Sequence, residues 1–417
     1  PRFWGYITSS PAPLGALADL LASLINPNVG GWTLSPVASE IEAQTVRWIA
    51  DLIGFPSAGG LLASGGNLAN MLGFWTARAC KADWNVRETG MGSGSPPMKI
   101  YVSSETHTWI QKAADLSGIG TSAISWIPSG PDRRIDLRQL EATITRDKEE
   151  GAYPFLVVGN AGTVGTGAVD PLSEMAEICR KFDLWFHVDG AYGGLAARVP
   201  GAPPELAAGI EMADSVAVDP HKWLYSPLEA GCFLVRREED LYRTFSYRPS
   251  YYHLEEEATN YFECGIQNSR GFRALKVWLC LQQAGRQGYL RLIGEDMALA
   301  RELLHILQQR PDFEALSTNL SITTFRYLPE RLRSSRSEKK ERYLDELNRE
   351  ILSRLETGGE IFLSNVILDD RFYLRSCIVN FRTRLGDLEV LPEIVSRVGR
   401  EVDQEMSRGV EGIHPLR

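Results

Sequence analysis

Short runs of apolar residues alternate with longer segments of helical periodicity from about residue 60 to residue 285. The short runs are typical of buried strands and cover residues 155–158, 184–188, 215–218 and 232–235. Between the first two runs, Leu172, Met175 and Cys179 recur at helical spacing, and we expect Asp170 to cap this helix with Pro171 in its first turn. Strands that alternate with helices predict an α/β fold with a mostly parallel sheet and helices on both of its faces.

The pattern changes after about residue 286 and predicts a second, smaller domain of the α+β class. Its expected elements are a helix at 289–308, a strand near 322–327, a mixed-charge helix that begins in 334–348, strands at 361–368 and 372–381, and a C-terminal helix. We therefore expect three parts: an N-terminal segment (1–50), a large domain (51–285) and a small domain (286–417).

The composition indicates a globular protein and excludes some classes of function. Of the 417 residues 44% are hydrophobic, and the net charge of −9 argues against nucleic acid or an anionic membrane as a partner. No apolar run approaches the length of a membrane span, and the apolar stretch 14–25 is predicted to be a helix rather than a signal peptide. Six cysteines without CxxC spacing predict a reducing, cytoplasmic environment.

Two polar stretches that follow predicted strands contain groups able to bind an anion or an aromatic ring. ASGGNLAN at 63–70 places two glycines before a helix, where free backbone N–H groups attract a phosphate. SSETHTW at 103–109 places His107 after a strand at 99–102. Taken alone, the first stretch could be an ordinary turn, and His107 could be a capping or core histidine.

Asp189 and Lys222 form the second pair of strand-end residues. Asp189 follows the strand in FHVDGAYGG, and Lys222 follows the strand 215–218 in DPHKWLYSP. Taken alone, Asp189 could belong to a structural salt bridge, and Lys222 could be a surface lysine in a turn. Because ligands gather at the carboxyl ends of parallel strands, however, we expect both residues at one edge of the sheet.

Together, the four features predict a site for pyridoxal 5′-phosphate (PLP). Lys222 would form a Schiff base with the aldehyde, and Asp189 would keep the pyridine nitrogen protonated. His107 would lie flat on the ring, and the glycine turn would bind the phosphate. A dinucleotide site would need GxGxxG after a strand with an acidic residue about 20 positions later, and no such motif is convincingly placed. We expect no metal.

The motifs HVDGAYGG, DPHKWLYSP, SGGNLAN and LRSCIVNFRT resemble, in this order, those of the group II PLP-dependent amino-acid decarboxylases, such as the aromatic-L-amino-acid and tyrosine decarboxylases. The resemblance runs from Pro1 to the C-terminus and implies the fold-type-I PLP-dependent transferase fold, with the roles given above for Lys222, Asp189 and His107. It further implies Gly66, Asn67 and His221 at the phosphate, Thr163 near the ring oxygen or Asp189, and Ala191 against the ring.

Residues 259–270 resemble the mobile catalytic loop of this family, which reaches into the partner subunit and so implies a homodimer. Tyr261 matches the tyrosine that protonates the substrate after CO₂ leaves, and its alternative is an ordinary tyrosine of a flexible loop. Phenylalanine at this position accompanies aldehyde synthases. Ser269 matches a position where serine goes with phenolic or imidazole substrates. Tyr6, Ser9 and Trp32 match the substrate-pocket wall, to which the segment 1–50 is expected to contribute.

The sequence departs from the family pattern at two positions, since Leu68 replaces an acidic residue and Gly190 replaces the usual alanine. We predict a carboxy-lyase that converts an L-amino acid, with tyrosine or DOPA favoured, to the amine and CO₂. The alternatives are an aldehyde synthase or carbon–carbon lyase on the same fold, or a non-catalytic relative that binds PLP.

Overall fold

The computed structural model of the chain describes residues 2–92, 94–248, 258–334 and 337–411. These residues form two compact units. The large unit consists of Ser9–Val164 and Ala168–Arg291, and the small unit consists of Pro1–Thr8, Gly165–Gly167 and Leu292–Arg417. The three-part division into 1–50, 51–285 and 286–417 stays a prediction.

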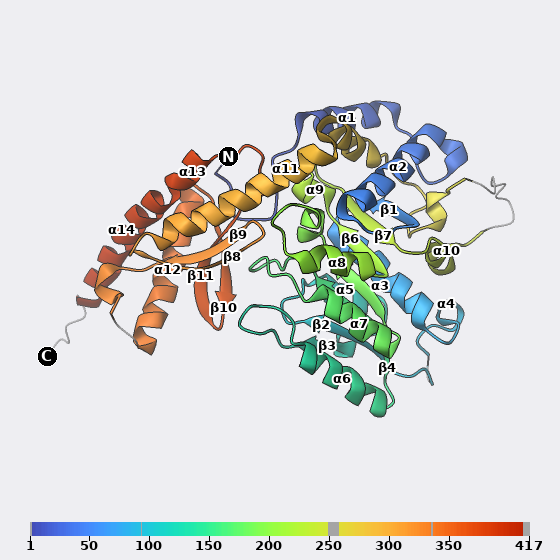
Figure 1. Ribbon diagram of the computed structural model, residues 1–417, viewed down its shortest axis with the longest axis horizontal. Helices are drawn as coiled ribbons and strands as arrows, with labels where there is room; N and C mark the ends of the chain where they lie inside the picture. Colours follow the sequence, from blue (N-terminus) through green and yellow to red (C-terminus); the bar gives the residue numbers. More distant parts are fainter. Residues whose placement is uncertain (1, 93, 249–257, 335–336, 412–417) are drawn as a thin grey trace. The chain divides into compact units, whose positions relative to one another are not determined.

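A seven-stranded sheet in the order β1-β7-β6-β5-β4-β2-β3 forms the centre of the large unit (Figure 1). Its strands are β1 (Gly59–Ala63), β2 (Met98–Ser103), β3 (Ile124–Ile127), β4 (Tyr153–Asn160), β5 (Trp185–Asp189), β6 (Ser215–Val218) and β7 (Gly231–Val235). All neighbours pair in parallel except β7, which is antiparallel to both β6 and β1. The predicted mostly parallel sheet is therefore confirmed, and the four predicted strands correspond to β4, β5, β6 and β7.

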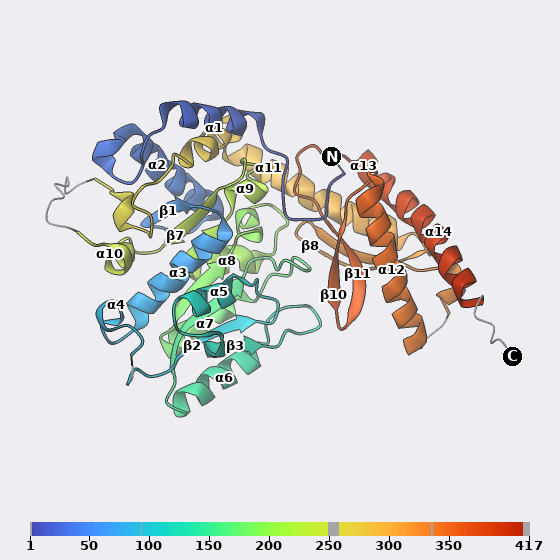
Figure 2. The ribbon, with the colours of Figure 1, turned by 180° about the vertical axis from the view of Figure 1, so that it is seen from behind.

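Helices cover both faces of this sheet. The large unit contains α1 (Pro13–Ile25), α2 (Pro36–Ile53), α3 (Gly66–Lys81), α4 (Val86–Thr89), α5 (Trp109–Leu116), α6 (Leu137–Glu149), α7 (Leu172–Phe182), α8 (Pro204–Met212), α9 (Pro220–Trp223) and α10 (Glu239–Phe245). Figure 1 shows α6, α7 and α8 in front of the sheet, and Figure 2 shows α3 and α5 on the opposite face.

The start of α7 differs from the prediction. The helix begins at Leu172, and Asp170 does not cap it. Instead, the fully buried Asp170 carboxylate accepts hydrogen bonds from the backbone of Ile135 (2.9 Å) and from the backbone and side-chain nitrogens of Asn160 (both 2.8 Å). Burial raises the pKa of Asp170, while these hydrogen bonds oppose the shift. Asp170 therefore joins β4 to the chain before α6, a long-range contact that local sequence does not specify.

The small unit is an α+β structure, as predicted. Its antiparallel sheet has the order β10-β11-β9-β8, with β8 (Phe313–Asn319), β9 (Ile322–Tyr327), β10 (Ser364–Leu368) and β11 (Arg371–Cys377). Its helices are α12 (Glu338–Gly358), α13 (Leu385–Glu389) and α14 (Leu391–Glu411). Helix α11 (Ala274–Gln308) begins before the predicted residue 289 and bends at Gly285, where φ is 64°.

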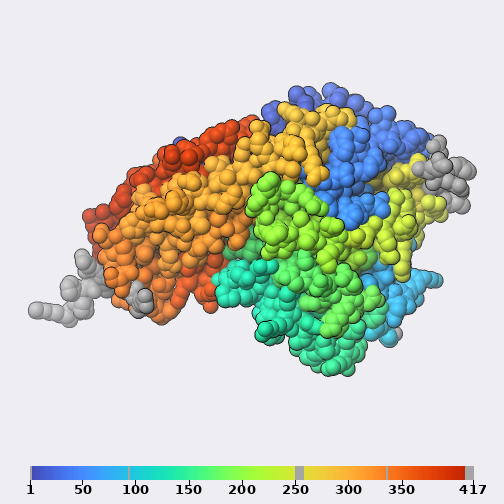
Figure 3. Space-filling view, viewed as in Figure 1, coloured from blue at the N-terminus to red at the C-terminus, as the bar shows by residue number. Residues whose placement is uncertain are grey.

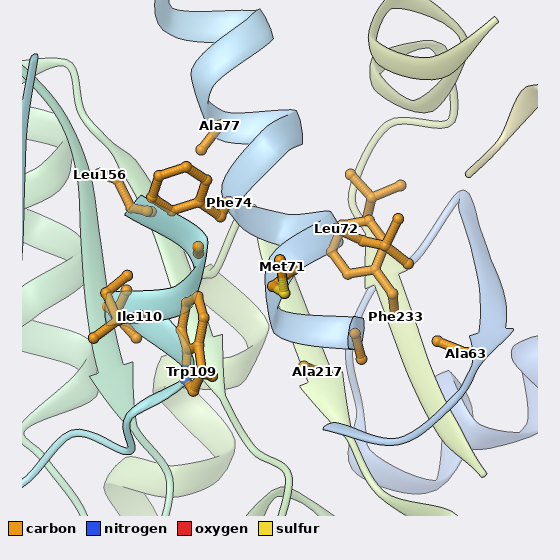
Figure 4. Close-up of a cluster of buried hydrophobic side chains, with 14 of the residues drawn as sticks. Ala63, Met71, Leu72, Phe74, Ala77, Trp109, Ile110, Leu156, Ala217 and Phe233 are labelled. Atoms are coloured by element: carbon orange, nitrogen blue, oxygen red, sulfur yellow. The ribbon is translucent and has the colours of Figure 1, made fainter. Parts of the chain in front are cut away.

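The core of the large unit positions the strand ends that carry the polar residues. Figure 4 shows side chains of α3, such as Phe74, and of α5, such as Trp109 and Ile110, in a cluster with Leu156 of β4 and Phe233 of β7. Burial of such side chains contributes roughly 1.5–3 kcal/mol each. The packed helices fix α5 and the start of α3 beside the sheet.

Candidate active site

The polar strand-end residues meet at one edge of the large sheet. In the register of the parallel strands, Asn160 of β4 pairs with Asp189 of β5, and Asp189 pairs with Ala217 of β6. A pocket at this edge is lined by residues from several of these segments. Among the predicted site residues it contains Gly66, Asn67, His107, Thr163, Asp189, Ala191 and Lys222. The structure therefore brings together the predicted lysine, the residues predicted for the ring, and Gly66 and Asn67 of those predicted for the phosphate.

Asp189 is held by two hydrogen-bond donors. The indole Nε1 of Trp109 donates to Asp189 Oδ2 at 2.8 Å, and the backbone N–H of Ala191 donates to Oδ1 at 3.2 Å. Within the part of the chain that the structure describes, no cation forms an ion pair with Asp189. Its carboxylate is thus oriented at the pocket wall and keeps its charge available for a positive group.

Lys222 lies on the one-turn helix α9, directly after β6. Its Nζ is 3.0 Å from Oδ2 of Asp219, whose side chain is only 2% exposed. The other oxygen of Asp219, Oδ1, is buried and has no hydrogen-bond partner among the residues that the structure describes. Sequence reasoning missed Asp219 as a site residue, although it follows the end of β6 just as Asp189 ends β5.

The glycine turn before α3 forms the floor of the pocket. Gly65 has φ 87° and ψ 173°, a conformation that favours glycine, and a Cβ on Gly66 would lie 2.5 Å from Oδ2 of Asp219. In the described part of the chain no side chain caps α3, and its first N–H groups can therefore bind an anion. His221 lies against Gly65 rather than in the pocket lining, and its Nδ1 lies 2.7 Å from the carbonyl oxygen of Ala230. Its contact with a phosphate stays a prediction.

His107 occupies the segment between β2 and α5. Its Nδ1 accepts a hydrogen bond from the backbone N–H of Trp109 at 3.3 Å. Desolvation by the pocket walls lowers the pKa of His107; the Asp189 carboxylate opposes this shift, and Lys222 adds to it. A neutral imidazole at this position suits stacking against a ring.

The structure does not bring Tyr261 to the pocket. Its side chain is 1% exposed, and its ring lies over the guanidinium of Arg270, 4.7 Å from the ring centre. Burial and the nearby Glu42 carboxylate raise the pKa of its hydroxyl well above the ordinary value. Tyr261 is therefore enclosed in the core of this chain and absent from the pocket lining, and its role in protonating the substrate stays a prediction.

The four predicted substrate residues also lie outside the lining of this pocket. Ser9 donates to the carbonyl oxygen of His221 at 3.2 Å, and Trp32 donates through Nε1 to Glu40 at 3.0 Å. Ser269 is exposed. Tyr6, which belongs to the small unit, is 54% exposed with its ring near Phe362. Their roles in binding substrate stay predictions.

A family model described as the pyridoxal-dependent decarboxylase conserved domain matches residues 1–328. The chain belongs to the pyridoxal-dependent decarboxylases. This decarboxylase is 33% identical over 410 residues to an aromatic-L-amino-acid decarboxylase of Bacillus atrophaeus, covering 96% of this chain and 82% of the relative. It is 29% identical over 415 residues to a 4-hydroxyphenylacetaldehyde synthase of Rhodiola rosea, covering 96% and 81%.

Among solved structures, the Oryza sativa protein TDC, crystallised with PLP and tryptamine, matches with a TM-score of 0.88 and 26% identity over 96% of this chain and 84% of that chain. The comparisons confirm the predicted family, the fold class and the cofactor, PLP. The protein is a PLP-dependent carboxy-lyase, an amino-acid decarboxylase. No helix among the described residues is both long and apolar enough to span a membrane.

The residues present fit PLP. The uncapped start of α3 offers N–H donors for a phosphate, and the Lys222 amine is within the same pocket for an aldehyde. The anionic carboxylate of Asp189 suits a protonated ring nitrogen, and no cation among the described residues neutralises it.

Proposed function

We propose that this decarboxylase converts an aromatic L-amino acid, with L-tyrosine or a related phenolic acid favoured, to its amine and CO₂. The observation that carries the proposal is the pocket in which Lys222, Asp189 and His107 lie beside the glycine turn of α3. The match to the Bacillus atrophaeus relative supports an aromatic substrate. The phenolic preference is supported only by the family resemblance at Ser269.

In this proposal, each residue of the pocket has a separate task. Lys222 would hold the aldehyde of the cofactor through its amine. The N–H groups at the start of α3 would bind the phosphate, His107 would lie against the ring, and Asp189 would keep the proton on the ring nitrogen. When bound, PLP supplies the electron sink that accepts the bonding electrons of the departing carboxylate.

We further propose that the enzyme is a homodimer that uses the outer face of α1. This face presents Leu17, Leu20, Leu21, Leu24 and Ile25, which are 45–75% exposed. Helix α1 lies at the surface of the molecule (Figure 3). The inner face is already packed, because Lys276 of α11 binds Asp19 at 3.2 Å. Five exposed large aliphatic side chains on one helix suit contact with a second copy.

The oligomer can be tested by analytical ultracentrifugation over a range of concentrations. The variant Leu20→Asp/Leu24→Asp is expected to be monomeric, because burying two carboxylates in an apolar contact is costly. Leu116→Asp is the matched control, since Leu116 is 73% exposed on α5, away from this face. A dimeric Leu20→Asp/Leu24→Asp variant, or a monomeric wild type, contradicts the proposal.

The reaction can be tested with a panel of L-tyrosine, L-DOPA, L-phenylalanine, L-tryptophan, L-histidine and L-glutamate. We expect equal amounts of amine and CO₂, with the highest rates for the phenolic substrates. Lys222→Ala is expected to lose both the visible absorption of the bound cofactor and activity, whereas Lys112→Ala, which changes an exposed lysine outside the pocket, retains both. Normal turnover by Lys222→Ala would overturn the mechanism.

Product analysis also separates the alternatives. The similarity to the Rhodiola rosea relative supports an aldehyde synthase as the alternative function. Such a reaction would consume O₂ and water and would release the aldehyde, CO₂, ammonia and hydrogen peroxide. A carbon–carbon lyase would cleave the substrate without releasing CO₂, and a non-catalytic relative would bind PLP without turnover.

A further inference from the structure

We infer that Trp109 is the positioning residue of this site: its indole N–H fixes the carboxylate of Asp189 toward the cofactor ring. The inference rests on the proposed role of Asp189. Trp109 is the first residue of α5 and is 1% exposed. Its Nε1 donates to Asp189 Oδ2 at 2.8 Å, in a region closed to solvent.

The indole is itself held in place, which makes it a rigid donor. Its ring meets that of the buried His187 edge to face, with the ring centres 5.9 Å apart and the planes at 79°. His187 in turn is fixed by Ser215 Oγ and Asn70 Oδ1, each 2.8 Å from a ring nitrogen. A donor locked by packing on one side presents its N–H in one direction only.

Asp189 depends on this donor more than a surface carboxylate would. Its other oxygen receives a single, longer hydrogen bond of 3.2 Å from Ala191, and no cation of the described residues pairs with it. The carboxylate can rotate about the Cβ–Cγ bond unless a hydrogen bond holds Oδ2. The indole bond therefore selects the orientation in which the remaining lone pairs face the pocket.

The same residue also orients His107. The backbone N–H of Trp109 donates to His107 Nδ1 at 3.3 Å. Trp109 thus contacts two of the residues proposed to touch the ring, Asp189 through its side chain and His107 through its backbone. Substitution of the side chain removes only the first contact.

The experiment measures the dissociation constant of PLP from the otherwise intact chain, together with the visible spectrum of the bound cofactor. Trp109→Phe keeps an aromatic ring and removes the N–H. We expect it to raise the dissociation constant about 10- to 100-fold, as for loss of a hydrogen bond to a charged group. Trp109→Gln restores an N–H donor and is expected to recover part of this loss and the wild-type spectrum.

Trp75→Phe is the matched control. Trp75 packs against the same core and donates through Nε1 to Ser117 Oγ at 2.8 Å, but it does not line the pocket. It should destabilise the cofactor-free chain without changing PLP affinity. Equal weakening by Trp109→Phe and Trp75→Phe, unchanged affinity in Trp109→Phe, or no recovery in a folded Trp109→Gln overturns the inference. Asp189→Asn tests the underlying role separately, because unchanged PLP affinity in that variant refutes the role of Asp189 itself.

Discussion

Replacement of Glu42 by glutamine tests the most deeply buried ion pair among the described residues of the large unit. Glu42 of α2 and Arg270 are 0% and 1% exposed at their side chains. Arg270 donates to both carboxylate oxygens, at 2.5 and 3.0 Å, and also to the carbonyl oxygens of Val29 and Leu62. Glu42 additionally accepts the backbone N–H of Leu62 at 2.9 Å. The ion pair therefore joins α2 to Leu62 of β1 and to the segment that contains Arg270.

The expected cost of Glu42→Gln follows from this geometry. An amide has one acceptor oxygen instead of two, and its NH₂ group would face the donors of Arg270. The guanidinium would remain buried without a counter-charge, because Glu42 is its partner in this network. Loss of one partner from a buried pair costs about 3–5 kcal/mol, which is a large part of the roughly 5–15 kcal/mol that stabilises a typical domain.

The free energy of unfolding, measured by denaturant titration, checks this prediction. Asp183→Asn is the control, because Asp183 pairs with Lys81 at 2.7 Å but its side chain is 95% exposed, so a much smaller loss is expected. The double variant Glu42→Leu/Arg270→Met should lose less than the sum of the two single changes, since it leaves no unpaired charge. The reasoning is refuted if Glu42→Gln costs no more than Asp183→Asn.

Three further predictions concern the site and its surroundings. Tyr261→Phe should leave the ratio of amine to aldehyde unchanged, because the hydroxyl is enclosed in the core. A shift toward aldehyde would contradict this reasoning. Asp219→Asn should speed the attachment of pyridoxal, followed by visible absorption, several-fold, because the Lys222 amine loses the carboxylate that binds it at 3.0 Å and can turn more readily to the aldehyde; slower attachment would contradict this. Burial lowers the pKa of His187 to about 4 from the ordinary 6.5, with Asp189 opposing. The unfolded state therefore binds a proton that the folded state does not, and the free energy of unfolding should fall as the pH drops from 6.5 toward 4, with a smaller decrease in His187→Gln.

Much of the site could be predicted from the sequence because its residues follow strands that have strong local signals. The apolar runs 155–158 and 215–218 predict strands without reference to the rest of the chain, and parallel strands place their carboxyl ends at one edge. His107, Asp189 and Lys222 therefore had to lie near one another once the sheet was recognised. Asp219 stands in the same kind of position, and the same signal could have found it.

The contacts between side chains were decided only by the tertiary structure. The burial of Tyr261 depends on Arg270 and Glu42, which lies more than two hundred positions away in the sequence, and no local pattern reports such a pairing. Likewise, Asp170 binds Asn160 instead of capping α7, and the indole of Trp109 reaches Asp189 across 80 positions. The sequence by itself determined the order of strands and helices and the chemistry available at their ends, since these depend on local periodicity and residue type. The partner of each buried polar group was settled by packing, because it depends on which distant segments the core brings together.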